Sequence, residues 1–218
     1  MTEGQSETNF VKKVMTPYFA GSCILIPITV ITKTDHRHGK TYKGGVANYN
    51  QIRNTLIKTL ASSSKSKNSF VTTMFDFYRL PADVPGVTEA EKINDPYRKV
   101  EFIEREILKA ESCNGDFFFP YIELHEFEAM LFADVERLEE AYFEYDLTPL
   151  KECVVKQGNP ELINGGAETS PSKRIINCIK HFDKANVGVD VLEKIGIEKI
   201  AEKCHHFSEW VKSIEKRI

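Results

Sequence analysis

The sequence predicts an α/β protein with a small, largely parallel sheet flanked by helices, followed by a mostly helical C-terminal part. Two observations support this fold class. Apolar, strand-like runs alternate with segments of helical spacing through the first two thirds of the chain, as in parallel sheets with crossover helices. The last third, from Leu147, shows mostly helical patterns separated by polar loops.

Each element has its own signal. Ser6 is suited to cap the first helix, Pro27 favours an edge position for the first strand-like run, CILIPITVI, and Pro96 suits the first turn of a helix. Helices are expected over 6–19, 46–61, 95–111 and 125–143, and strands over 23–31, 69–75 and 117–124. The long connection over 77–95 suggests a functional role.

Composition limits the class of protein. The chain has 218 residues, 41% of them hydrophobic and 28% charged, which suits an α/β core over 1–146 with a helical region over 147–218 packed on it as one structural unit. A net charge of −3 excludes a general basic coat for nucleic acid but leaves room for a local basic groove. The polar N-terminus, the scattered cysteines and apolar runs far below the roughly 20 residues of a membrane span predict a soluble, cytoplasmic protein.

Acidic residues close the strand-like runs. Glu3, Asp76 and Glu123 each lie at or near the end of such a run. Because ligands of parallel sheets bind at the carboxyl ends of the strands, we expect these three side chains to converge at one edge. Carboxylate oxygens are hard ligands, so the sequence predicts a site for one or two Mg²⁺ or Mn²⁺ ions.

The stretch DFFFPYIELHEFEAMLF places further charges inside an apolar run. Glu126 and Glu128 are additional candidate metal ligands, and His125 is a candidate supporting residue. Alternatively, the two glutamates stabilise a helix N-terminus and His125 is a hydrogen-bonded core residue. A zinc site through His125 and Glu128 is a weaker alternative, since HxxE lacks a third ligand.

Two basic segments are candidate contacts for phosphate. Ser172, Lys173 and Arg174 stand at an expected helix start after Pro171, where backbone N–H groups and two cations suit an anion. Lys43 belongs to a basic loop, KTDHRHGKTYKGG, that is suited to a nucleic-acid backbone. In each case the alternative is a solvated basic surface.

Five blocks of the chain, in order, resemble the bacterial domain-of-unknown-function family four-two-seven-six: EGQSETNFVKKVMTPYF, VTTMFDFYRLP, PYIELHEFEAMLF, GNPELINGGAETSPSKRI and CHHFSEWV. The resemblance implies a compact Toprim-like domain, the metal-dependent fold of topoisomerases, primases and related nucleases. It also implies an ABC-type ATPase partner encoded nearby, in anti-phage defence regions.

Glu3 with Gly4, and Asp76, match the acidic positions of the Toprim pattern. The chain departs from that pattern in two places. It has Asp76-Phe77-Tyr78 in place of Asp-x-Asp, and only Met1 and Thr2 precede Glu3, where a full strand is usual.

The leading expectation is therefore a metal-dependent phosphodiesterase or nuclease acting on DNA or RNA. Glu3 would be the general base or a metal ligand, Asp76 a catalytic metal ligand, and Lys173 the cation that neutralises the phosphate. The alternative is a non-catalytic docking or sensing partner of the ATPase, which the short first strand and the missing Asp-x-Asp favour.

Overall fold

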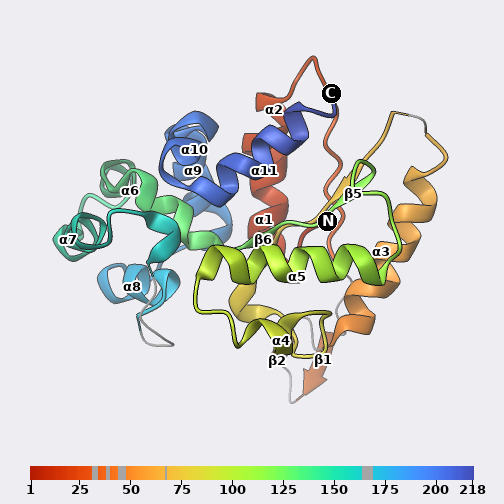
Figure 1. The fold of residues 1–218 in the computed structure, drawn as a ribbon. Helices are drawn as coiled ribbons and strands as arrows, with labels where there is room; N and C mark the ends of the chain where they lie inside the picture. The colour runs from red at the N-terminus through yellow and green to blue at the C-terminus, as the bar shows by residue number, and fades with distance from the viewer. Residues whose placement is uncertain (31–33, 38–39, 44–47, 67, 164–168) are drawn as a thin grey trace. The chain divides into compact units, whose positions relative to one another are not determined.

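The computed structural model describes residues 1–30, 34–37, 40–43, 48–66, 68–163 and 169–218, with the backbone alone for 34–37 and 40–43. These residues group into two compact units. Figure 1 shows the helices and strands of the chain as a ribbon. The first unit contains residues 1–4 and 28–122, and the second contains 5–27 and 123–218. The chain thus passes between the units after Gly4, Pro27 and Ile122.

Short chain segments form a parallel sheet in the first unit. Thr2 bridges Thr29 on one side and Met74 on the other, both in parallel. β3 (Val71–Thr72), in the same segment as Met74, pairs in parallel with β5 (Phe118–Phe119). The order across the sheet is the segment of Thr29, the N-terminal residues, β3 and β5, which confirms the small, largely parallel sheet predicted from the sequence.

Met1 and Thr2 lie between two segments of this sheet. The N–H of Thr2 donates to the carbonyl of Ile28 at 2.9 Å, and the N–H of Val30 donates back to the carbonyl of Thr2 at 2.9 Å. On the other side, the N–H of Met74 donates to the carbonyl of Met1 at 2.8 Å. These bonds fix the register of the two residues that precede Glu3.

The third and fourth segments of the sheet are each interrupted once. β4 (Phe75–Asp76) continues the segment of β3 and pairs with β6 (Ile122–Glu123), which continues that of β5. At the interruption, the buried Thr73 hydroxyl donates to the carbonyl of Tyr121 and accepts from its N–H, both at 2.9 Å. Pro120 has no N–H to donate at this point, and the Thr73 side chain joins the two segments at the next residue, Tyr121. A separate antiparallel hairpin joins β1 (Thr34–Arg37) and β2 (Lys40–Lys43).

Two long helices belong to the first unit and confirm two of the predicted ones. α3 (Tyr49–Ser63) contacts β3, and α5 (Pro96–Ala110) contacts β5. Side chains of Asn48 and Asp95 each accept a hydrogen bond from the first turn of the helix that follows. The buried residues of α5 are spaced three and four apart, so the helix presents one apolar face.

The second unit is helical. Its helices are α1 (Gln5–Phe10), the π-helix η1 (Val11–Met15), α2 (Thr16–Tyr18), the 3-10 helix η3 (Phe127–Ala133), α6 (Val135–Ala141), α7 (Thr148–Gln157), the 3-10 helix η4 (Pro160–Leu162), α8 (Pro171–Cys178), the π-helix η5 (Lys184–Gly188), α9 (Val189–Ile195), α10 (Ile197–Lys203) and α11 (His205–Glu215). Its core includes Phe10, whose ring centroid lies 5.6 Å from that of Phe127 and 6.2 Å from that of Phe207. The helix expected over 6–19 is confirmed, with a π-helical turn in its middle.

The segment 125–143 differs in detail from the continuous helix expected there. Residues Phe127–Ala133 form a 3-10 helix, and α6 begins only at Val135. All seven residues of the 3-10 helix are buried, including Glu128. The apolar run therefore has no solvent-facing side, and packing on all sides decides its backbone rather than helical periodicity.

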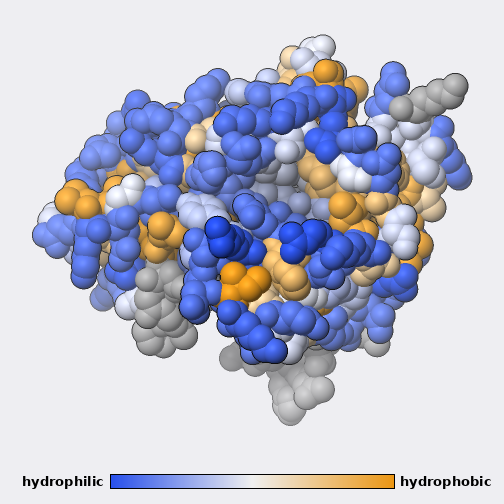
Figure 2. All heavy atoms as spheres, in the orientation of Figure 1, coloured by the Kyte–Doolittle hydropathy of each residue, from blue (hydrophilic) through white to orange (hydrophobic). Residues whose placement is uncertain are grey.

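Every helix in the described part of the chain is too short or too polar to cross a bilayer. The face drawn in Figure 2 is mostly hydrophilic, with hydrophobic residues in small separate groups.

Candidate functional site

Glu3 and Asp76 follow neighbouring parallel strands of the first unit. The bridge between Thr2 and Met74 fixes the register, so Glu3 comes one residue after the bridge and Asp76 two residues after it. Asp76, the last residue of β4, is 3% exposed, and Glu3 is partly exposed. Both acids therefore lie at the carboxyl edge of this sheet, where the sequence placed them.

Glu123, the last residue of β6, belongs to the second unit and is 1% exposed. A neighbour in that unit is the buried thiol of Cys204. Burial raises the pKa of Cys204 well above its usual range, and the charges of Glu161 and Glu123 raise it further. A thiol with a raised pKa stays protonated, so Cys204 is a poor nucleophile.

Glu126 has a partner within the second unit. Its Oε2 atom accepts a hydrogen bond from the backbone N–H of Ser172 at 2.9 Å. Ser172 is the second residue of α8, so this carboxylate, which comes from 46 residues earlier in the chain, caps the helix. The expected anion position at this helix start is thus filled by the protein's own side chain.

The other residues of that basic segment differ in their surroundings. Arg174 donates from Nε to the carbonyl of Thr169 at 2.7 Å, which holds it to the turn before the helix. Lys173 is exposed. The Lys43 side chain lies outside the described residues, and its role stays a prediction.

Glu128 forms a buried ion pair that the sequence did not predict. Its Oε2 atom lies 3.0 Å from Nζ of Lys184, which also lies 3.6 Å from Oε1 of Glu7. The same ammonium stands over the ring of Phe127, 5.3 Å from its centroid. Burial raises the pKa of Glu128, the charge of Lys184 opposes this rise, and nearby Glu126 adds to it. Two buried carboxylates therefore share one ammonium.

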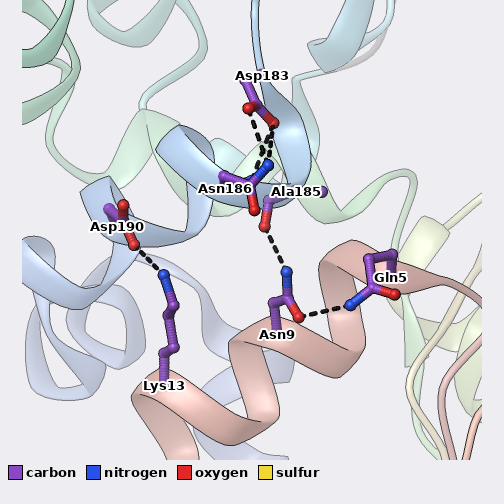
Figure 3. Close-up of polar contacts among 7 residues, drawn as sticks. All are labelled: Gln5, Asn9, Lys13, Asp183, Ala185, Asn186 and Asp190. Atoms are coloured by element: carbon purple, nitrogen blue, oxygen red, sulfur yellow. Dashed lines mark hydrogen bonds and ion pairs between the residues drawn. The ribbon is translucent and has the colours of Figure 1, made fainter.

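Side-chain contacts hold the segment that carries Lys184 against α1 (Figure 3). Asn9 donates from Nδ2 to the carbonyl of Ala185 at 2.8 Å and accepts from Gln5 at 2.7 Å. One turn further on, Nζ of Lys13 lies 2.5 Å from Oδ1 of Asp190. No local pattern in the sequence pairs residues this far apart, which is why Glu7 and Lys184 were missed.

Replacing Lys184 with methionine is expected to lower the free energy of unfolding by about 2–4 kcal/mol near neutral pH, because it leaves buried carboxylates without their cation. The raised pKa of Glu128 means that the folded protein binds this proton at a higher pH than the unfolded chain does. The free energy of unfolding therefore falls as pH rises through that pKa. In the variant, the pKa of Glu128 is higher still because the charge of Lys184 is gone, so the variant loses more stability over the same pH range. Urea unfolding at several pH values between about 5 and 8 measures the loss.

Lys13→Met is the matched control for this prediction. It removes an ion pair whose side chains are 45% and 51% exposed, so its effect is expected to be much smaller and nearly independent of pH in this range. Equal losses for the two variants would contradict the central role of Lys184.

The predicted metal ligands divide between the units, with Glu3 and Asp76 in the first and Glu123, Glu126 and Glu128 in the second. Within the described residues of either unit, no three His, Cys, Asp or Glu side chains form a group able to hold a metal ion. His125 is buried at 6% exposure, and a role for it in supporting the ligands stays a prediction.

Comparison with known proteins gives one result. Neither the curated proteins nor the solved structures contain a match to this chain. A family model does match, over residues 2–215, and its description is Domain of unknown function (DUF4276). Since the match covers nearly the whole chain, the protein belongs to this family.

Proposed function

We propose that this protein is a divalent-metal-dependent phosphodiesterase that acts on nucleic acid. The observation that carries the proposal is the position of Glu3 and Asp76 after neighbouring parallel strands, with the Thr2–Met74 bridge setting their register. Acids at the carboxyl edge of a parallel sheet are suited to hold a cation. The Toprim-like resemblance of the sequence assigns its acids to the same two positions.

The two acids of the first unit suit Mg²⁺ or Mn²⁺, because Glu3 and Asp76 offer carboxylate oxygens, the hard ligands that these ions prefer. Glu123, in the second unit, stays a predicted ligand. Glu126 and Glu128 are less suitable, since their carboxylates already bind Ser172 and Lys184. Such an ion, when bound, activates water and stabilises the leaving oxygen of a phosphodiester. In the proposal Asp76 holds the ion and the partly exposed Glu3 is a further ligand or accepts a proton from water.

The test is cleavage by the purified protein. Single-stranded DNA, duplex DNA, RNA and tRNA are incubated with Mg²⁺ or Mn²⁺, and products are separated by electrophoresis. We expect cleavage that EDTA abolishes and that Asp76→Asn lowers by about 100-fold or more, since a metal supplies several kcal/mol of transition-state stabilisation. Glu101→Gln, which changes an exposed carboxylate on α5 of the same unit, serves as the control and keeps full activity.

A second candidate function is a docking or sensing partner of an ABC-type ATPase. The specific observation in its favour is that Glu126 and Glu128 have protein partners and so serve the fold. The family resemblance implies the same ATPase partner for both candidate functions. In the first, this protein is the effector of an anti-phage system, and in the second it is the adaptor. A double variant with Glu3→Gln and Asp76→Asn separates them. Protection from phage that survives both changes supports docking, and loss of protection with an intact complex supports catalysis.

A further inference from the structure

An aromatic turn follows directly on Asp76. The 3-10 helix η2 (Phe77–Arg79) begins at the next residue, so its side chains leave the sheet edge that carries the acids. The Tyr78 side chain is 39% exposed to solvent, and Phe77 is half-buried. The ring centroids of the two lie 6.3 Å apart with planes tilted by 31°. An aromatic surface therefore adjoins the proposed catalytic edge.

Cations border this surface. Lys99, in the first turn of α5, places its ammonium over the ring of Phe77, 5.8 Å from the centroid. Arg79, the last residue of η2, is exposed. An aromatic surface with a lysine ammonium over one ring, and an arginine one residue after the exposed ring, suits a ligand with a flat face and negative charges, which is the chemistry of a nucleotide in a strand.

The connection over 77–95 is ordered, which holds the aromatic turn in place. The N–H of Leu80 closes η2 by donating to the carbonyl of Phe77 at 3.2 Å. Further on, the carboxylate of Asp83 accepts from the N–H of Tyr49, at the start of α3, with distances of 2.9 and 3.0 Å. Val84 and Ala90 of the same connection are buried. A surface fixed in this way loses little conformational entropy when a ligand binds.

We propose that Tyr78 stacks on an unpaired base and that Lys99 and Arg79 bind the adjoining phosphates, so that the substrate is single-stranded nucleic acid. The proposal rests on the proposed function and names its substrate class. In a duplex both faces of a base are covered by neighbouring bases, whereas in a single strand one face is free for a tyrosine ring. A bound strand would then lie with a phosphodiester next to Asp76, two residues from Tyr78.

The experiment measures binding without cleavage. Fluorescence anisotropy follows labelled single-stranded DNA and RNA of about ten nucleotides, and the corresponding duplexes, in EDTA. We expect tighter binding of the single strands and a loss of affinity of about 5- to 150-fold for Tyr78→Ala, which corresponds to the loss of one base–aromatic stack. Tyr78→Phe keeps the ring and is expected to bind like the wild type. Phe143→Ala, which removes an 83% exposed ring of the second unit, is the matched control and leaves binding unchanged.

The outcomes separate this proposal from the proposed function. Single-strand binding that depends on Tyr78, without any metal-dependent cleavage, supports the stacking surface and refutes the phosphodiesterase. Cleavage that Asp76→Asn abolishes, with Tyr78→Ala binding like the wild type, refutes the stacking surface alone. Equal affinity for duplexes and single strands, or no binding of either, also overturns the stacking proposal.

Discussion

Replacing Glu161 with alanine is expected to lower the free energy of unfolding by about 3–5 kcal/mol, the largest loss among the changes considered for the second unit. The Glu161 side chain is 0% exposed. Its two carboxylate oxygens accept hydrogen bonds from the backbone N–H groups of His206 at 3.0 Å and Phe207 at 2.9 Å. These are N–H groups of the first turn of α11, which has no intrahelical partner for them.

The large effect follows from burial. Alanine would leave two N–H groups in a water-free interior, and each buried, unsatisfied donor costs about 1–3 kcal/mol. Removal of the side chain also leaves space beside Phe207, a core residue. Urea or thermal unfolding followed by circular dichroism measures the loss.

Asp146→Ala provides the matched control. Asp146 also accepts from a helix-start N–H, that of Thr148 at 2.9 Å, but its carboxylate is exposed, so water can replace it. We expect a far smaller loss than for Glu161→Ala, and Glu161→Gln, which keeps one acceptor oxygen, should fall between them. A loss for Glu161→Ala as small as that for Asp146→Ala would show that the α11 cap is dispensable.

Gly86→Ala is expected to destabilise the first unit by about 2–4 kcal/mol. Gly86 has a φ of +88°, which L residues with a Cβ rarely adopt. A Cβ at this position would lie 2.9 Å from Cβ of Glu106 and 3.3 Å from Cα of Ile103, both on α5. Neither atom is the end of a flexible side chain, so the connection over 77–95 would have to move away from the helix. Chemical unfolding gives the stability, and single-strand affinity shows whether the turn of Tyr78 moves with the connection.

Gly21→Ala separates the two causes. Gly21 has a similar φ of +93°, but nothing lies within 4 Å of the position of its Cβ. Its substitution therefore measures backbone strain alone, expected at about 1 kcal/mol. If both variants lose the same stability, close packing against α5 contributes nothing to the fixed path of the connection.

Local patterns in the sequence located the helices and the strand-end acids. The predicted helices over 46–61 and 95–111 correspond to α3 and α5, because helical periodicity and caps such as Asp95 lie within a few residues of each other. Asp76 was placed at a strand end for the same reason, since SFVTTMF directly precedes it. Thr2 lies between the segments of Thr29 and Met74, so Glu3, the next residue, is at the carboxyl edge of the sheet.

The reasons for which buried acids are tolerated came only from the tertiary structure. The sequence offered a metal ion as one explanation for Glu126 and Glu128, whereas the fold gives them Ser172 and Lys184 as partners. Each partner lies tens of residues away, on elements whose approach depends on packing of the whole unit. Contacts between residues so far apart leave no periodic pattern in a single sequence. Composition and spacing therefore show which side chains are costly to bury, and only the folded chain decides which partners stabilise them.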